Sequence, residues 1–519
     1  MTAPLRELAK IVGDDRVSTR HSDRVAYSRD LWQRDILGVR EGKTPPGPEV
    51  IVWPENAAQV SALVKLAKKR GLIVVPFGAG SGVCGSARSS MAPSELSPGS
   101  APGRMAMDMK RLRAIRSIDA DRGIAEVETG ILGEVLEREL NHRGWTLGHF
   151  PSSIYCSTLG GFVAARSAGQ LSTKYGKIED MITGLELVLP SGEIVQLEEG
   201  AATPELTQLF VGAEGTLGLC TAAKLRVSRL PEEQILRAWS FDGVDNGLAA
   251  IRTLLQAGLK PAVVRLYDEF DTVMALAGKS GPKKKGLAAL LSPKKVAGEL
   301  FGLFPSVKNQ AMALALKRPA ALNRLAGVLG DRALMILMFE GPRAGTRLEA
   351  AEAERLLRGK KATDLGAAPA ERWKQRRYAI SYNQSKVFAA GAFNDTAEVA
   401  STWDKLPALY EGVKAAVGRH AFIMAHFSHA YPEGCSIYFT FVGQSPTADG
   451  ARALYDRIWA DLLAAVVAAG GTISHHHGVG LSKARFLPEE LGAGGMKALR
   501  ALKVAIDPAR TFNPGKLGL

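Results

Sequence analysis

Hydrophobic residues in the first half of the chain follow helical and strand spacing in turn. Four apolar residues at helical spacing predict a helix over residues 56–70: Val60, Leu63, Val64 and Ala67. Short apolar runs predict strands over residues 50–53, 72–75, 105–108, 123–128, 184–189 and 194–197, and two further helices are predicted over 132–143 and 159–165. Helices that alternate with strands in this way predict an α+β domain with a mixed sheet.

After Pro231 the pattern predicts a second sheet. The expected strands cover residues 234–241, 261–267, 334–339, 422–429 and 435–442, and the expected helices cover 247–257, 344–358 and 449–468. Residues 86–103 are rich in Ser, Pro and Gly and are expected to be a loop. We therefore expect two domains, with the last 50 or so residues returning to the first.

Composition is that of an ordinary globular protein. The 519 residues are 46% hydrophobic and 23% charged, and the mean hydropathy is -0.00. Residues 1–14 read as an amphipathic helix without a signal-peptide core, and no apolar run reaches the roughly 18–20 residues of a membrane span. The cysteines lie far apart and form no C-x-x-C pair, which favours a reducing, cytoplasmic location: Cys84, Cys156, Cys220 and Cys435.

The net charge of +14 is concentrated between Lys279 and Arg324. Lysines and arginines in this stretch are interleaved with Leu and Phe, and Glu299 is its one acid. A basic segment with apolar residues is typical of peripheral contact with an anionic membrane surface, and a solvated insertion explains it equally well. Nucleic-acid binding is not expected, because no zinc-finger, RNP or helix-turn-helix pattern accompanies the charge.

Glycine-rich loops mark the first candidate site. Residues 76–82, Pro-Phe-Gly-Ala-Gly-Ser-Gly, follow a predicted strand and place several backbone N–H groups together, as a pyrophosphate requires. Residues 80–85 also satisfy G-x-G-x-x-G, with Asp108 at a suitable distance. A dinucleotide fold would need a helix after these glycines, and the prolines at 93, 98 and 102 argue against one.

Two further loops repeat the combination of glycine and hydroxyl groups. Residues 151–161 place Ser, Thr and paired Gly directly before a predicted helix, and residues 212–218 form a Gly-Thr turn that enters a strand. One such loop is weak evidence. Three of them in one domain predict a long ligand that backbone and hydroxyl donors grip along its length.

In this order, the three loops resemble the FAD-binding domain of vanillyl-alcohol-oxidase-type flavoproteins, and the resemblance extends from Trp53 to Lys516. It implies a two-subdomain α+β FAD-binding domain, a cap domain on a mixed or antiparallel sheet with helices, and noncovalently bound FAD. The residues that it implies for FAD binding are Pro76, Phe77, Gly78, Ala79, Gly80, Ser81, Gly82, Ser152, Ser153, Ile154, Tyr155, Cys156, Ser157, Thr158, Ala165, Arg166, Ser167, Ala168, Glu214, Gly215, Thr216, Leu217, Gly218, Leu219 and Cys220.

The resemblance also divides the chain. We expect an N-terminal helical extension (1–44), the FAD-binding domain (45–232), a cap or substrate domain (233–469) with a basic insertion at about 279–330, and a C-terminal segment (470–519) that returns to the FAD domain. A homodimer and a monomer are both open at this point.

The run His475-His476-His477-Gly-Val-Gly is the most unusual local sequence in the chain. One interpretation is a metal site, with His426 and His429 as additional ligands, although no acid or cysteine stands at suitable spacing. The other is a base beside the flavin, because the pKa of imidazole lies near working pH. We expect no metal.

The histidine run resembles the active-site segment of the alkylglycerone-phosphate synthase family, also called alkyldihydroxyacetone-phosphate synthase. Residues 434–439 resemble that family's catalytic tyrosine segment, which implies a catalytic role for Tyr438, and residues 265–268 resemble its arginine segment, which places Arg265 near the flavin. The alternatives are that Tyr438 is a core aromatic and that Arg265 only pairs with Asp268. The implied reaction is redox-neutral: a histidine removes a proton, a fatty acid leaves acyl-dihydroxyacetone phosphate, and a long-chain alcohol forms an ether lipid through a flavin adduct.

One segment departs from that family. Residues 382–386 lack the arginine that the family uses for the substrate's phosphate, and Lys386, Arg376 or Arg377 is expected to replace its charge. The main alternative is a 2-hydroxy-acid dehydrogenase or oxidase of the D-lactate or glycolate type, although residues 426–431 lack the acid expected in its metal motif. A non-catalytic, membrane-associated binding protein is a third hypothesis.

Overall fold

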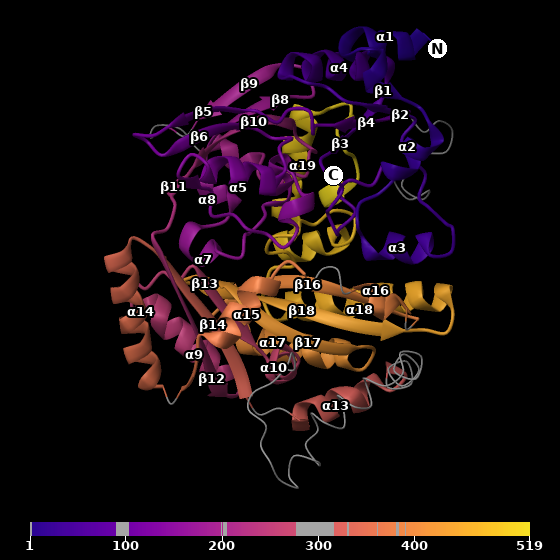
Figure 1. The fold of residues 1–519 in the computed structure, drawn as a ribbon. Helices are drawn as coiled ribbons and strands as arrows, with labels where there is room; N and C mark the ends of the chain where they lie inside the picture. Colours follow the sequence, from indigo (N-terminus) through magenta and orange to yellow (C-terminus); the bar gives the residue numbers. More distant parts are fainter. Residues whose placement is uncertain are drawn as a thin grey trace. The chain divides into compact units, whose positions relative to one another are not determined.

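The computed structural model describes residues 3–89, 103–198, 200, 205–276, 316–329, 332–360, 362–379, 384–389 and 391–519. They form two compact units (Figure 1): the first comprises Met1–Leu230 and Ile473–Leu519, and the second Pro231–Thr472. Both units combine helices with sheets, which confirms the predicted α+β class.

The first unit holds two larger sheets and therefore two subdomains. One has the order β1-β2-β4-β3, in which β2, β4 and β3 run parallel, and the other is antiparallel with the order β5-β6-β10-β8-β9. The strands are β1 (Val17–Ser18), β2 (Val50–Val52), β3 (Ile73–Phe77), β4 (Arg104–Asp108), β5 (Ile115–Asp119), β6 (Ile124–Glu128), β7 (Trp145–Thr146), β8 (Ile182–Val188), β9 (Ile194–Glu198), β10 (Leu219–Arg226) and β11 (Ser228–Arg229).

The helices of this unit begin and end where local chemistry requires. The longer ones include α4, whose N-cap Asn56 accepts a hydrogen bond from the Gln59 N–H, and which ends at Gly71 with φ 64°. The α-helices are α1 (Ala3–Val12), α2 (His21–Ala26), α3 (Gln33–Val39), α4 (Ala57–Arg70), α5 (Gly133–Asn141), α6 (Leu159–Ala165), α7 (Ser172–Tyr175), α8 (Ile178–Met181) and α19 (Leu487–Ile506).

The second unit is built on one antiparallel seven-stranded sheet with the order β15-β12-β14-β13-β17-β18-β16. Its strands are β12 (Glu233–Asp242), β13 (Val263–Tyr267), β14 (Arg332–Gly341), β15 (Thr363–Gly366), β16 (Ala392–Thr402), β17 (Phe422–Ala430) and β18 (Gly434–Gln444). Its α-helices are α9 (Gly243–Gln256), α10 (Glu269–Leu276), α13 (Pro319–Leu329), α14 (Arg343–Arg358), α15 (Ala368–Arg376), α16 (Gln384–Ala389), α17 (Leu406–Gly418) and α18 (Ala448–Ala468).

The two faces of this sheet differ in character. Along β18 the residues Ile437, Phe439 and Phe441 are fully buried, and Phe439 and Phe441 pair with Tyr410 of α17 and Trp459 of α18. The alternate residues Tyr438 and Thr440 are only half-buried. Because successive side chains of a strand point to opposite faces, one face carries the core beneath helices and the other carries polar groups.

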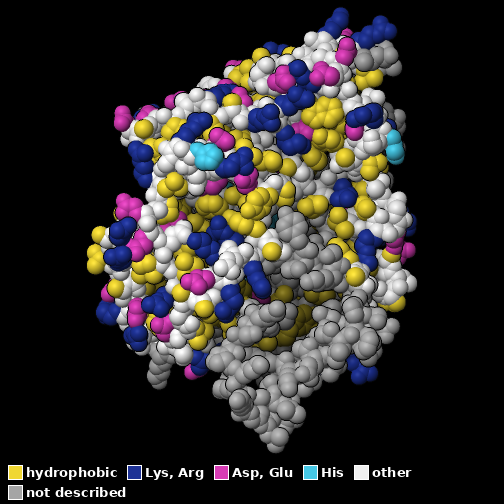
Figure 2. Space-filling view, viewed as in Figure 1, with side chains coloured by type: hydrophobic (Ala, Val, Ile, Leu, Met, Phe, Trp, Pro, Cys, Tyr) yellow, Lys and Arg dark blue, Asp and Glu magenta, His cyan; other side chains and the backbone are white. Residues whose placement is uncertain are grey.

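The sequence predictions match the described elements closely, apart from a few boundaries. The helix expected over residues 247–257 begins earlier, at Gly243, and several elements were not predicted, among them β5, β15, β16, α10, α13, α15, α17 and α19. Most of the basic insertion expected at 279–330 lies outside the described residues. On the face shown in Figure 2, Lys and Arg side chains are interspersed with Asp and Glu. No helix in the described part of the chain is long and apolar enough to cross a membrane.

Candidate active site

The first two glycine-rich loops lie side by side in the first unit. A Cβ atom on Gly78 would come within 2.5 Å of the Thr158 Oγ1. The Ser81 and Ser157 Oγ atoms lie 2.7 Å apart, and the Ser157 hydroxyl donates to the Ser153 Oγ at 2.6 Å. The two loops therefore join into a continuous row of hydroxyl groups beside a backbone that only glycine permits.

Asp108 supports the first loop together with Tyr27 and Lys110, two residues that the sequence analysis did not select. The Asp108 carboxylate is fully buried and accepts hydrogen bonds from the Tyr27 hydroxyl at 2.5 Å and the Lys110 Nζ at 2.6 Å. The Lys110 Nζ also donates to the Gly78 carbonyl at 2.9 Å. Asp108 therefore fixes the loop rather than acting as the acid of a dinucleotide motif, and Tyr27 brings the N-terminal extension into this support.

The start and end of α6 connect the second loop to the third. Thr158 caps the helix by accepting a hydrogen bond from the Gly161 N–H at 3.2 Å. Arg166 ends it at φ 55°, and its Nη2 donates to the Val211 carbonyl at 3.1 Å. Next to it, the Ser167 Oγ lies 2.6 Å from the Nε2 of buried His149.

His149 was not predicted as a site residue. Burial lowers its pKa to about 3, so that its ring is neutral near pH 7. Its Nδ1 is buried and has no hydrogen-bond partner in the described part of the chain. A buried polar atom of this kind requires a partner, and a bound ligand can provide one.

Glu214 of the third loop has a different role from the one expected. Its carboxylate is buried and accepts hydrogen bonds from the backbone N–H groups of Val479 at 2.6 Å and Gly480 at 2.9 Å. The Ser86 hydroxyl donates to the same carboxylate at 2.7 Å. Burial raises the pKa of Glu214, and these three donors oppose the shift. The carboxylate thus holds the segment after the histidine run and is not left free for a ligand.

Glycine is required where these segments cross. A Cβ on Gly480 would lie 2.1 Å from the Cys84 carbonyl oxygen, and one on Gly215 would lie 2.3 Å from the Pro76 Cγ. Both glycines also have positive φ angles, of 53° and 69°. The third loop therefore packs directly on the Pro76 ring of the first loop, and the C-terminal segment packs on the backbone at Cys84.

The side chains of some predicted FAD-binding residues are buried or already bonded within the protein. Ile154, Leu217 and Leu219 are buried apolar residues, the Thr216 hydroxyl donates to the Ala213 carbonyl, and the Cys220 Sγ contacts the Ala222 carbonyl. In contrast, Tyr155 and Cys156 are exposed.

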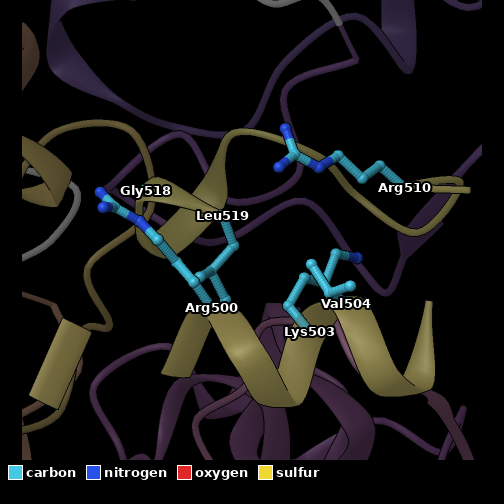
Figure 3. A pocket seen from close by; sticks show the side chains of 6 residues that line it. All are labelled: Arg500, Lys503, Val504, Arg510, Gly518 and Leu519. Atoms are coloured by element: carbon cyan, nitrogen blue, oxygen red, sulfur yellow. The ribbon is translucent and has the colours of Figure 1, made fainter. Parts of the chain in front are cut away.

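The C-terminal segment is anchored by a buried ion pair. The Lys503 Nζ lies 2.6 Å from the Asp507 Oδ2 and also donates to the Thr216 carbonyl at 2.6 Å. Asn513 donates to the Glu214 carbonyl at 2.8 Å. A cavity of about 120 Å³ lies beside Lys503 (Figure 3), lined also by Arg500, Val504, Arg510, Gly518 and Leu519. It contains none of the predicted site residues, and the Lys503 amine already has its partners.

The three histidines lie in contact with one another. The Nδ1 atoms of His475 and His476 are 2.9 Å apart, and the rings of His476 and His477 are 4.5 Å apart. His475 is buried, whereas His476 and His477 are half-buried. Among the described residues, no group of three or more His, Cys, Asp or Glu side chains is arranged to hold a metal ion.

The second unit gathers the other predicted catalytic residues on the polar face of its sheet. Tyr438 lies directly opposite His426 in the strand register, and the two rings stack with centroids 4.9 Å apart and planes 18° apart. The Thr396 hydroxyl donates to the Tyr438 hydroxyl oxygen at 3.1 Å, and burial raises the pKa of Tyr438 to about 12. Tyr438 therefore stands on the face opposite to the core.

Arg265 contacts His426 rather than Asp268. Its Nη2 lies 2.6 Å from the His426 Nε2, while Asp268 accepts from the Ala425 N–H at 2.9 Å and faces the Lys414 Nζ at 3.5 Å. The alternative in which Arg265 only pairs with Asp268 is therefore wrong. His426, considered in the sequence only as a metal ligand, is the neighbour of both Arg265 and Tyr438.

The residues expected to replace the missing phosphate arginine are less well defined. Lys386 belongs to α16, but its side chain lies outside the described part of the chain, as do residues 382 and 383. Arg376 ends α15, and the Arg377 guanidinium lies 4.7 Å from the centre of the Tyr378 ring. The role of Lys386 stays a prediction.

Comparison with known protein families shows which family this protein belongs to. The family described as FAD linked oxidases, C-terminal domain, matches residues 230–517, which is more than half of the chain, and the FAD binding domain family matches residues 48–198. The chain belongs to the FAD linked oxidase family. It is an FAD-dependent enzyme, and FAD is its cofactor.

Individual relatives within this family include alkyldihydroxyacetonephosphate synthases and, at lower identity, a glycolate oxidase subunit. The chain is 29% identical to an alkyldihydroxyacetonephosphate synthase of Trypanosoma brucei brucei, covering 98% of this chain and 80% of that protein. A solved structure of an alkyldihydroxyacetonephosphate synthase matches with a TM-score of 0.75 and 26% identity, covering 99% of this chain and 84% of that one. The glycolate oxidase subunit GlcD of Bacillus subtilis is 24% identical, covering 98% of this chain and 96% of that protein.

The residues of the first unit fit FAD. The glycines at 78, 80 and 215 leave no room for a Cβ, because Thr158, Phe77 and Pro76 pack directly against them, so these loops present backbone groups without side chains. Ser81, Ser153 and Ser157 offer hydroxyl groups, and the buried Nδ1 of His149 is without a partner in the described part of the chain. The donor set is therefore neutral, as expected for a ligand held by backbone and hydroxyl contacts.

Proposed function

We propose that this FAD linked oxidase family member exchanges the acyl group of an acyl-dihydroxyacetone phosphate for a long-chain alcohol, as an alkyldihydroxyacetonephosphate synthase does. The observation that carries the proposal is the cluster of His475, His476 and His477, in a chain that is 29% identical over 98% of its length to such a synthase. In the balanced reaction one ester C–O bond breaks, one ether C–O bond forms, and the alcohol proton leaves with the released fatty acid.

The proposal gives each residue one task. A histidine of the run accepts the substrate proton, because its imidazole has a partner ring that can share the charge. The Tyr438 phenol relays a proton, since its hydroxyl accepts a hydrogen bond from Thr396 and its raised pKa of about 12 keeps it protonated near pH 7. Arg265 supplies a cation for an anionic substrate, and Lys386 is proposed to add a second.

FAD, when bound, supplies a flavin ring that takes part in the exchange and is returned unchanged, so that no external oxidant is needed. We propose that the chain holds it without a covalent bond, by the glycine backbone at 78 and 80 and the hydroxyls of Ser81 and Ser157. Precipitation of the purified holoenzyme with acid should therefore release all of the flavin into the supernatant. Flavin that stays with the pellet would contradict noncovalent binding.

Incubation of the holoenzyme with an acyl-dihydroxyacetone phosphate and labelled hexadecanol is the direct test. We expect the label in an alkali-stable ether, one fatty acid released for each ether formed, and no net bleaching of the flavin absorbance under anaerobic conditions. These three readings follow from a redox-neutral exchange.

The competing hydroxy-acid oxidation predicts the opposite pattern. Anaerobic addition of D-lactate or glycolate would bleach the flavin within one turnover, and no label from hexadecanol would enter the ether fraction. That outcome would replace the synthase with a 2-hydroxy-acid dehydrogenase or oxidase, the reaction class of the 24% identical GlcD relative.

Partners and location are proposed on the sequence alone. The lysine-rich stretch between Lys279 and Arg324 supports peripheral contact with an anionic membrane surface, from which lipid substrates would be drawn. The absence of C-x-x-C pairs supports a cytoplasmic location.

A further inference from the structure

A chain of three polar side chains runs across the polar face of the second unit's sheet. The Arg265 Nη2 lies 2.6 Å from the His426 Nε2, and the His426 Nδ1 lies 3.3 Å from the Asp271 Oδ2. Arg265 comes from β13, His426 from β17 and Asp271 from α10. The three groups thus meet through the fold rather than through sequence proximity.

The chemistry of Arg265 and Asp271 determines which nitrogen of the His426 ring carries the proton. A guanidinium can only donate, so the His426 Nε2 must accept, and the proton of a neutral ring must sit on Nδ1, the atom that faces the Asp271 Oδ2 at 3.3 Å. Burial and the nearby Arg265 charge lower the pKa of His426 well below its usual value, so the ring is neutral. Burial raises the pKa of Asp271 to about 6, and the Arg265 charge opposes this rise.

We propose that His426 is a positioning residue that holds the Arg265 guanidinium while keeping the Asp271 carboxylate one imidazole ring away. A direct Arg265–Asp271 pair would commit the positive charge to the carboxylate. With a neutral ring between them, the guanidinium is oriented and its charge stays available to an anionic oxygen acid, either a phosphate or a carboxylate.

Arg265 keeps an unused donor for such a ligand. Its Nε is buried and has no hydrogen-bond partner among the described residues. A buried guanidinium N–H of this kind costs free energy unless a ligand pairs with it. The proposal rests on the proposed function only for the identity of that anion.

Two substitutions of His426 distinguish its contacts with Arg265 and Asp271 from the stacking of its ring on Tyr438. In His426→Gln, the amide can still accept from Arg265 and donate to Asp271, but the ring that stacks on Tyr438 is lost. In His426→Phe, a ring can still stack, but both hydrogen bonds are lost. We expect His426→Phe to raise KM for the anionic substrate about 10–100-fold, with a smaller fall in kcat, because hydrogen bonds to charged groups have effects of this size. His426→Gln should retain KM within about 3-fold.

A control and a double-mutant cycle complete the test. His420→Phe removes another hydrogen-bonded histidine of the same unit, whose Nε2 lies 2.9 Å from the Asp461 Oδ2, and should leave KM unchanged. Asp271→Asn should raise KM alone but add little in the His426→Phe background, since contacting residues are not additive. Equal KM values for wild type and His426→Phe, or full additivity, would overturn the proposal.

A spectroscopic reading does not depend on turnover. In holoenzyme with ¹⁵N-labelled histidine, the resonance that His426→Gln removes should show a neutral ring protonated at Nδ1 at pH 7, and Asp271→Asn should alter it. A His426 ring protonated at Nε2 would contradict the proposed Arg265–His426–Asp271 arrangement even if ether synthesis is observed. Conversely, if the expected tautomer is found but no ether product forms, the proposed substrate is contradicted and the Arg265–His426–Asp271 arrangement is supported.

Discussion

Replacing His476 with alanine is expected to lower kcat/KM for ether formation by about 10²–10⁴-fold, the usual contribution of a general acid–base group. The reason is its position: His476 contacts both of the other histidines, with its Nδ1 2.9 Å from that of His475 and its ring 4.5 Å from that of His477. It is also half-buried, whereas His475 is buried. Single-turnover measurement of labelled ether, with FAD content determined in parallel, checks this expectation.

A histidine of the same unit outside the run provides the matched control. His142 is exposed at the end of α5, and His142→Ala should leave both turnover and flavin content unchanged. If His476→Ala forms ether at the wild-type rate with a full complement of FAD, the middle histidine is not the base, and His475 or His477 becomes the candidate.

Much of the fold can be predicted from the sequence because apolar and polar residues alternate regularly along its strands. Ile437, Phe439 and Phe441 of β18 are spaced by two and are buried in the core, as the pattern predicts. The neighbouring strand β16 was missed because it carries Asp395 and Glu398, both buried. Asp395 is tolerated there because the Tyr455 hydroxyl and the Trp459 Nε1 donate to it at 2.7 and 3.2 Å, a contact that no local pattern reveals.

Helix α19 was missed for a different reason. Its sequence contains Gly492, Gly494 and Gly495, and Gly492, with φ 70°, interrupts the helical geometry, so that α19 consists of two helical segments joined at a kink. Glycine lowers helix propensity by about 1 kcal/mol, so three of them in one turn argue against a helix on local grounds. After the kink, tertiary contacts stabilise the second helical segment, since Met496 and Lys503 are buried.

The candidate site shows where local sequence reasoning ends. The glycine and hydroxyl loops were found from composition, because each carries its own signal. The partners that hold them are distant in the sequence: Glu214 binds the N–H groups of Val479 and Gly480, and Tyr27 reaches Asp108. His426 was weighed only as a metal ligand, because its contact with Arg265, 161 residues away, has no sequence signature.

Replacing Glu214 with alanine is expected to destabilise the first unit by about 3–5 kcal/mol and to displace the segment after the histidine run. The substitution leaves three donors without their acceptor: the backbone N–H groups of Val479 and Gly480 and the Ser86 hydroxyl. Each buried donor left unsatisfied costs about 1–3 kcal/mol. Chemical denaturation of the holoenzyme, followed by flavin fluorescence and far-UV circular dichroism, measures the loss.

Glutamine at the same position distinguishes anchoring from charge. In Glu214→Gln one oxygen can still accept from Val479 and Gly480, and the Ser86 hydroxyl can turn to accept from the new amide. The variant should therefore stay within about 1 kcal/mol of the wild type and keep its FAD, because burial already disfavours the charged form and raises the pKa of Glu214.

Glu134→Ala, which removes a surface pair with Arg138, should cost only about 0.5 kcal/mol. If Glu214→Ala is as stable and as active as Glu134→Ala, the carboxylate does not anchor the histidine segment. If Glu214→Gln is as damaged as Glu214→Ala, the negative charge itself is required rather than the hydrogen bonds that it accepts.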